Sequence, residues 1–81
     1  DVDILAGDLQ ADPSVRDIRK NQQQVDVNGK KVGTNRPDLQ YDKDGCHNCV
    51  EYDKSSTRSD KHAEKIREND PDAQIEQNII E

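Results

Sequence analysis

Residues 36–53 have the sequence RPDLQYDKDGCHNCVEYD, in which two alternating runs, PDLQYD and HNCVEYD, flank the dipeptide Asp44-Gly45. Asp-Gly between such runs favours a two-residue type I′ turn, because both central positions of that turn need a positive φ. The stretch therefore predicts a β-hairpin with strands at about residues 37–43 and 47–53. A turn at this place pairs Lys43 with Cys46, and that pair sets the register of the whole hairpin.

This register gives the two faces of the hairpin opposite character. Counting outward from the turn places Asp38 opposite Glu51, and Cβ atoms in such a pair lie roughly 5 Å apart. Two carboxylates that close repel each other unless a cation or a proton lies between them. In proteins Mg²⁺ is usually held by one or two carboxylates together with water and phosphate oxygens. The pair therefore predicts a site for Mg²⁺ or Mn²⁺, and a pair of solvent-facing charges is the alternative. The other face carries apolar residues suited to a small core: Leu39, Tyr41, Val50 and Tyr52.

Capping residues, turn residues and periodicity predict the remaining elements. Asp12-Pro13 has the form of a helix N-cap followed by proline at the first helical position. Asn28-Gly29 is a second turn signal, and Pro71 stops a late helix. The predicted segments are an extended or frayed stretch at 1–11, a helix over about 12–24, short strands at 25–27 and 30–32, a helix at 59–69 and a strand at 73–79.

The expected fold is a single α/β domain over residues 12–81, in the order helix, three-stranded antiparallel meander, helix, strand. A helix between two strands of one sheet usually makes a parallel crossover. The chain has 81 residues, of which 28% are hydrophobic, and a chain of this kind is marginally stable alone. We therefore expect the tail of a larger protein, or a domain stabilised by a partner or a metal. The chain does not begin with Met, which fits a fragment, and it has no signal pattern and no apolar run of membrane-spanning length.

A net charge of −6 argues against binding of nucleic acid through charge alone. Basic residues are nevertheless concentrated on both sides of the hairpin, around residues 30–36 and 54–67. A solvated charged surface is one interpretation, and contact with phosphates is the other. The candidate nucleic-acid-binding residues are Arg36, Lys54, Arg58, Lys61 and His62.

Cys46 and Cys49 form a single CxxC motif. A zinc ribbon needs a second pair of ligands, and a thioredoxin-type motif follows a strand and opens a helix. Two ordinary thiols near a turn, able to form a disulfide, are the third interpretation and the one we favour.

Three segments of the chain resemble a known family: GTNRPDLQYDKDG at 33–45, VEYDKSSTRSDKH at 50–62 and NDPDA at 69–73. They are similar to the nuclease toxin domains at the C-termini of bacterial polymorphic toxins, the Rhs and contact-dependent growth inhibition proteins. The fold of those domains resembles the PD-(D/E)xK nuclease superfamily. The resemblance covers about residues 29–76, and its central motif is Pro37-Asp38 followed by Glu51.

The resemblance implies a restriction-endonuclease-like core and metal-dependent hydrolysis of phosphodiester bonds in DNA, with RNA as the other substrate. Asp38 and Glu51 would bind Mg²⁺, with the carbonyl of Tyr52 as a third ligand. Asp53 stands where the family has Lys and would add a third catalytic carboxylate, and no Glu precedes Glu51 on the first helix.

The same resemblance implies a biological setting. The domain would be delivered as part of a larger secreted toxin, would act in the cytoplasm of the target cell, and would bind a cognate immunity protein. The alternative function is a non-catalytic module that binds a partner or inhibitor protein.

Overall fold

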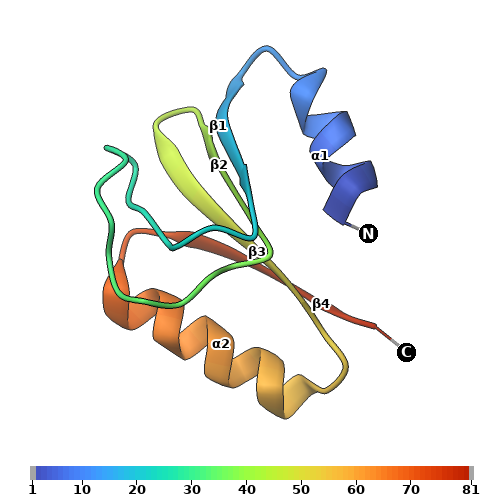
Figure 1. Cartoon of the computed structure of the whole chain (residues 1–81), viewed down its shortest axis with the longest axis vertical. Helices are drawn as coiled ribbons and strands as arrows, with labels where there is room; N and C mark the ends of the chain where they lie inside the picture. Colours follow the sequence, from blue (N-terminus) through green and yellow to red (C-terminus); the bar gives the residue numbers. More distant parts are fainter. Residues whose placement is uncertain (1, 81) are drawn as a thin grey trace.

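The computed structural model describes residues 2–80, which form a four-stranded mixed sheet and two helices (Figure 1). The α/β class is therefore confirmed. Along the sheet the strands follow chain order, with the first three antiparallel to their neighbours and the last parallel to the third. Residue 1 of the predicted frayed segment and residue 81 of the predicted domain lie outside the described residues. The elements are α1 (Val2–Gln10), β1 (Val15–Lys20), β2 (Leu39–Lys43), β3 (Cys46–Asp53), α2 (Ser56–Asn69) and β4 (Gln74–Ile79).

The predicted hairpin is confirmed as β2 and β3, with the register counted from the turn. The pairs run from Lys43 with Cys46 to Leu39 with Val50. The turn residues Asp44 and Gly45 have φ of 52° and 80°, the positive values that a type I′ turn requires. The first strand begins two residues later than predicted and the second one residue earlier. Continued outward, the register sets residue 38 opposite residue 51.

Residues 2–10 form helix α1, so the prediction of an extended or frayed N-terminal segment is wrong. Its apolar residues recur at the spacing of one helical face. That face packs on the apolar side of the hairpin, where Leu39 and Val50 are fully buried. The residues that α1 contributes to this cluster are Val2, Leu5, Ala6 and Leu9.

Residues 15–20 form strand β1 rather than the first helix predicted over 12–24. Asp12 does not cap a helix, because its Oδ1 accepts hydrogen bonds from the backbone N–H and the hydroxyl of Ser14. Such a side-chain bond two residues onward is a turn motif that competes with helix formation.

A β-bulge explains why the apolar spacing in β1 imitates a helix. Arg16 pairs with Asp42 and Arg19 with Gln40, so three steps along β1 match two along β2. An extra residue of this kind bends a strand and re-aims its side chains. Ile18 consequently packs against the cluster under α1.

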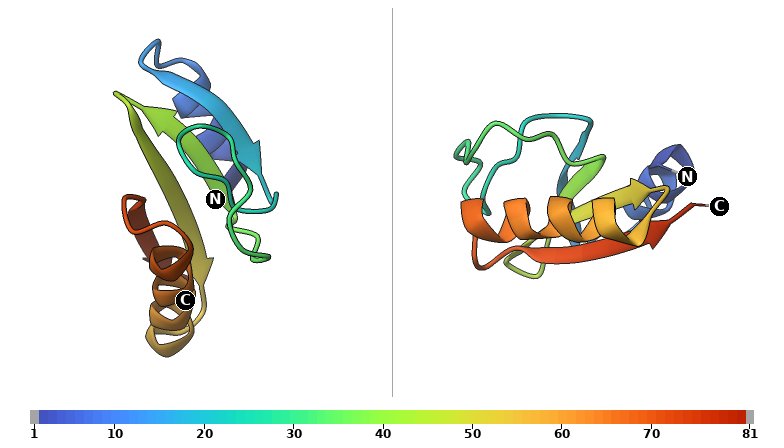
Figure 2. Two further views of the ribbon diagram at one scale, coloured as in Figure 1. Left: turned by 90° about the vertical axis from the view of Figure 1, so that its left-hand side faces the viewer. Right: turned by 90° about the horizontal axis from the view of Figure 1, so that it is seen from below.

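The connection between β1 and β2, residues 21–38, folds over the face of the sheet opposite α1 (Figure 2). The strands predicted at 25–27 and 30–32 are reduced to one isolated bridge between Val25 and Lys31. The turn predicted between them is present, with Gly29 at a φ of 80°. We refer to residues 21–38 as the crossing loop.

Buried amide side chains attach the crossing loop to the sheet and to α2. From β2, Gln40 accepts from the N–H of Val25 and donates to the carbonyls of Gln22 and Gln23. From the loop, Gln24 is fully buried and donates to the carbonyl of Ile66 in α2.

A second set of amides continues this attachment. The Oε1 of Gln24 accepts from Asn35 at 2.9 Å and from Asn69 at 3.1 Å. Asn69 also donates to the Oδ1 of Asn35. The end of the crossing loop is therefore bound to the last turn of α2, next to the start of β2.

Helix α2 and strand β4 agree with the prediction in type and nearly in position. The helix begins three residues before the predicted start, at Ser56, because Ser55 acts as N-cap and its side chain accepts from the N–H of Arg58. It ends at the predicted residue, and its inward residues Ala63 and Ile66 are buried. The crossover that it makes is parallel, as expected. No helix within residues 2–80 has the length and apolar character needed to cross a membrane.

Two glycine substitutions test the attachment of the crossing loop. Gly33 has a φ of 76°, and a Cβ there would overlap the side-chain amide of Asn69. We expect Gly33→Ala to lower the free energy of unfolding by about 1–3 kcal/mol, through backbone strain and a displaced amide. The measurement is the midpoint of urea unfolding.

Gly7→Ala is the matched control. Gly7 lies inside α1, where a Cβ would have no neighbour within 4 Å. This change should leave stability unchanged or raise it by up to about 1 kcal/mol, because Ala favours helix over Gly. Equal effects of the two substitutions would contradict the described attachment.

Candidate metal centre

Strand β3 is buried on both faces. Its successive side chains point to opposite faces, so apolar side chains lie on one face and acidic side chains on the other. Val50 joins the cluster under α1. Glu51 and Asp53 point to the opposite face, toward α2, and each is only 6% exposed. Successive residues of a strand point to opposite faces, so two residues at i and i+2 share one. Burial of two carboxylates side by side is costly unless a partner of opposite charge is present.

His62 from α2 supplies a nitrogen between these two carboxylates. Its Nδ1 lies 3.0 Å and 3.2 Å from the two carboxylate oxygens of Asp53. The same nitrogen is 3.6 Å from Oε2 of Glu51. The His62 side chain is 47% exposed, so the group is reached from solvent on that side.

These three residues have the donor atoms and the spacing of a metal site. One ligand atom from each of Glu51, Asp53 and His62 falls within 4.8 Å of the other two. Carboxylate oxygens suit Mg²⁺ and Mn²⁺, and an imidazole nitrogen is a ligand for first-row transition metals. The donor set therefore fits a divalent cation. Sequence reasoning placed His62 among the nucleic-acid contacts, which stays a prediction, and the fold of α2 over β3 brings it to the carboxylates.

Asp38 lies beside this group and helps to hold it. Its Oδ2 accepts from the backbone N–H of Tyr52 at 2.7 Å, and its own backbone N–H donates to the carboxylate of Glu51. Within residues 2–80 it is not part of the group whose ligand atoms all lie within 4.8 Å. The role of Asp38 and of the Tyr52 carbonyl as metal ligands stays a prediction.

The pKa of Glu51 is shifted by its buried position and by the charges around it. Burial, together with the negative charge of Asp38, raises the pKa of Glu51 from 4.5 to about 7. His62 acts in the opposite direction, and Asp53 adds to the rise. The carboxyl of Glu51 therefore keeps its proton to a higher pH than usual in the metal-free protein, and a cation in the group would favour the ionised form.

A small cavity of about 120 Å³ opens next to the carboxylates. It lies between the crossing loop and α2, and two of its lining residues, Arg36 and His62, were expected to contact nucleic acid. Sequence reasoning did not single out Lys65, although its spacing of three from His62 places both on one side of a helix. The lining residues are Asn35, Arg36, Glu51, His62 and Lys65.

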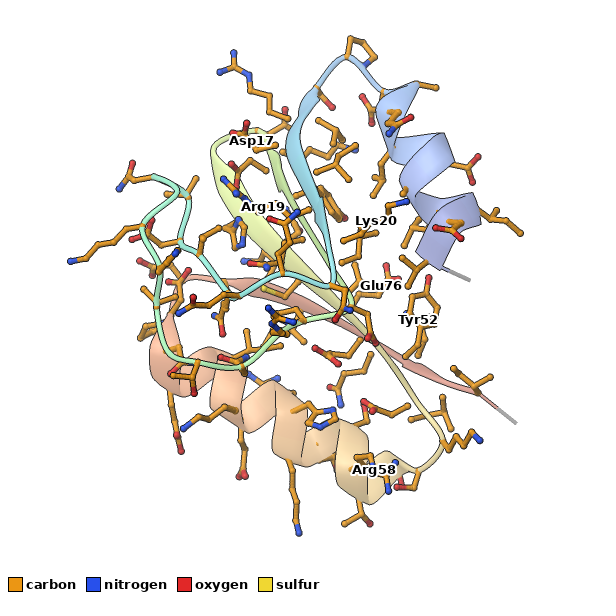
Figure 3. All side chains as sticks on the ribbon, in the orientation of Figure 1. Asp17, Arg19, Lys20, Tyr52, Arg58 and Glu76 are labelled. Carbon is orange, nitrogen blue, oxygen red and sulfur yellow. The ribbon has the colours of Figure 1, made fainter. Side chains whose placement is uncertain are left out.

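The other predicted nucleic-acid-binding residues are not part of the lining of this cavity. Lys54, Arg58 and Lys61 are exposed, and they do not line it. Figure 3 shows Arg58 in the first turns of α2, beyond the cap. Their contact with nucleic acid stays a prediction.

The two cysteines do not form a joint site. Both are free, with Cys46 exposed and Cys49 buried. Three steps along one strand separate their Cα atoms by roughly 10 Å and turn their side chains to opposite faces, whereas a disulfide needs Cα atoms less than about 7 Å apart. This geometry does not allow a disulfide between them, and the favoured interpretation as two ordinary thiols agrees with it.

The raised pKa of Glu51 predicts a dependence of stability on pH in metal-free buffer. Because the folded state binds this proton more tightly than the unfolded chain, the contribution of Glu51 to stability is complete below about pH 4.5. This contribution is lost as pH rises toward 7, and it is on the order of a few kcal/mol. Chemical unfolding at pH 5 and pH 8 measures the difference. Glu51→Gln should remove most of it, and Glu64→Gln, at an exposed position of α2, should not.

The cysteines predict one fast and one protected thiol. Burial raises the pKa of the Cys49 thiol to about 12, so it has little thiolate and little access to reagent. An aromatic disulfide reagent should therefore modify Cys46 alone in the native protein and both residues in denaturant. Absorbance of the released thiolate counts them, and two equally fast thiols in the native protein would contradict this structure.

No protein-family model matches this chain, and no curated protein and no solved structure matches it either.

Proposed function

We propose that this domain is a metal-dependent nuclease that hydrolyses phosphodiester bonds at the group formed by Glu51, Asp53 and His62. One observation carries the proposal: two buried carboxylates and an imidazole converge within 4.8 Å beside a cavity with basic residues in its lining. Acidic ligands bind a divalent cation, and basic residues bind phosphate oxygens. The combination is suited to a reaction at a phosphoryl group.

The cation would be held by the two carboxylates and by Nδ1 of His62. When bound, such an ion lowers the pKa of a water molecule and polarises the phosphoryl group. Mg²⁺ or Mn²⁺ was expected from the sequence, and the imidazole nitrogen favours Mn²⁺ of the two.

A metal ligand must present an unprotonated nitrogen, and the tautomer of His62 with its proton on Nε2 does so at Nδ1. The ion competes instead with the proton on Glu51, whose pKa burial raises to about 7. Metal affinity should therefore rise with pH through this range.

The order of the elements supports a restriction-endonuclease-like core for this proposal. Helix, antiparallel meander, helix and parallel strand are the order expected from the sequence patterns, although α1 and β1 lie where other structure was predicted. The chain departs from the family pattern in one residue of the site. Asp53 occupies the position at which the family has Lys, and in this proposal it binds the cation.

The proposed setting follows from the same resemblance. The domain would be the toxic part of a larger secreted antibacterial protein, acting in the cytoplasm of the target cell on DNA, or else on RNA. A cognate immunity protein would be its partner in the producing cell.

A non-catalytic interaction module is the second candidate. The net charge of −6 favours it, because this charge repels nucleic acid and attracts a basic protein surface. Enzymatic cleavage by the purified domain separates the two candidates directly.

Substitution of the metal ligands tests the proposal. Purified domain is incubated with plasmid DNA or with RNA, in Mn²⁺, in Mg²⁺ or in EDTA, and products are resolved on gels. Cleavage should need the ion, and Glu51→Gln, Asp53→Asn and His62→Ala should each reduce it at least about 100-fold, since even outer groups of metal sites are worth 10–100-fold.

Two controls make this test specific. Glu64→Gln changes an exposed carboxylate on α2 and should cleave as the unmodified domain does. The double change of Cys46 and Cys49 to Ser should also retain cleavage. If the three ligand variants cleave as well as the unmodified domain, the nuclease proposal is wrong and the interaction module is favoured.

A further inference from the structure

We propose that the cavity beside the metal ligands is a subsite for one phosphate group, and that Lys65 and Arg36 bind its oxygens. This inference rests on the proposed nuclease function and names the part of the substrate that the site recognises. It assigns to Lys65, one residue of the basic cluster at 54–67, a specific contact with the substrate.

The two cations reach the cavity from different elements. Arg36 belongs to the crossing loop, and Lys65 follows His62 by three residues on α2. Residues three apart on a helix are neighbours on its surface. One element therefore presents a metal ligand and a cation side by side, and the loop supplies the second cation across from them.

The charges in the cavity are arranged for an anion that also touches a cation in the carboxylate group. Glu51 lines the cavity together with Arg36 and Lys65, so one carboxylate and two cations border the same space. A phosphate oxygen that is bound to a metal ion would lie beside the carboxylate. The remaining oxygens of the same phosphate then meet the guanidinium and the ammonium groups.

The size of the cavity selects the group that enters. Its volume of about 120 Å³ corresponds to roughly four water molecules at about 30 Å³ each. Pockets that bury organic ligands have roughly 300–1,000 Å³. The space is large enough for a single phosphate and is smaller than the pockets that bury whole organic ligands.

The crossing loop holds the backbone of Arg36 in place. Its neighbour Asn35 is bound through its side chain to Gln24 and Asn69. On the other side Pro37 is fully buried. The residues on both sides are therefore fixed, and a cation carried on a fixed backbone binds an anion with a smaller entropic cost.

Calorimetric titration of inorganic phosphate into the Mn²⁺-loaded domain tests the subsite. Lys65→Ala and Arg36→Ala should each weaken phosphate binding about tenfold, the loss expected for one charge-assisted hydrogen bond. Neither change should alter Mn²⁺ affinity by more than about twofold, because neither residue belongs to the metal group. Lys65→Arg should keep most of the phosphate affinity.

Arg67→Ala is the matched control. Arg67 is exposed on the same helix and does not line the cavity, so this variant removes the same charge without removing a contact. It should bind phosphate as the unmodified domain does. Equal weakening by Arg67→Ala and Lys65→Ala would show a general charge effect and overturn the subsite.

A metal-free titration separates this inference from the nuclease proposal. At pH 8, above the pKa of Glu51, Glu51→Gln combined with Asp53→Asn removes the negative charge beside the cavity, so this double variant should bind phosphate more tightly than the unmodified metal-free domain. Adding Lys65→Ala to it should cancel the gain. If Mn²⁺ does not bind the unmodified domain but this pattern is found, the nuclease proposal fails and the subsite stands. If Lys65→Ala and Arg36→Ala bind phosphate normally in both titrations, the subsite is wrong.

Discussion

The two-residue period of β3 is the constraint on which the rest of the structure depends. This strand is covered on both faces, by α1 on one side and by α2 on the other, so it cannot shift by one residue without exchanging its faces. Such a slip would place Glu51 and Asp53 against the apolar cluster and Val50 under α2. The Asp44-Gly45 turn prevents it, because a two-residue turn permits only one register. The candidate metal centre therefore owes its geometry to a turn at the far end of the hairpin.

Amide side chains take the place that apolar residues have in larger domains. The chain contains no Trp, Phe or Met, and the residues that fill its second face include Gln24, Gln40 and Ser59, all fully buried. Buried polar groups stabilise a fold only when they are hydrogen-bonded. The two glutamines meet that condition by bonding the backbone of the crossing loop and of α2. These hydrogen bonds also specify one arrangement of the loop, because any other arrangement leaves their donors and acceptors unpaired.

The sequence predicted those elements whose signals are local and strong. The hairpin follows from its Asp-Gly turn, α2 from the stop at Pro71, and β4 from its alternation. Helix α1 was also encoded, by apolar residues at positions 2, 5, 6 and 9, but the segment was assigned as extended. Strand β1 was predicted as part of a helix, because a bulge gives Val15 and Ile18 the spacing of one helical face. The bulge depends on pairing with β2, which no local pattern records.

The candidate site likewise combines residues that a local sequence pattern places together with residues that only the tertiary structure brings together. Glu51 and Asp53 share a face through their spacing on one strand, and sequence reasoning recognised this. His62 and Lys65 join them only because α2 crosses back over β3, and the distance between a helix and a strand is set by packing in three dimensions. The position of Arg36 likewise depends on the crossing loop, which is held by hydrogen bonds of amide side chains. Amide residues are also common on protein surfaces, so their presence in a sequence does not reveal such bonds. Composition alone therefore does not identify these contacts.

The uncharged nature of the loop anchors has a consequence for behaviour in salt. Dissolved ions screen exposed charges over a distance of about 8 Å at physiological ionic strength, whereas hydrogen bonds between neutral amides have no net charge to screen. Rising ionic strength therefore weakens the long-range attraction of Arg36 and Lys65 for an anion and leaves the loop that carries Arg36 attached. In this molecule salt therefore weakens the attraction of a charged ligand without loosening the loop that forms part of its binding site.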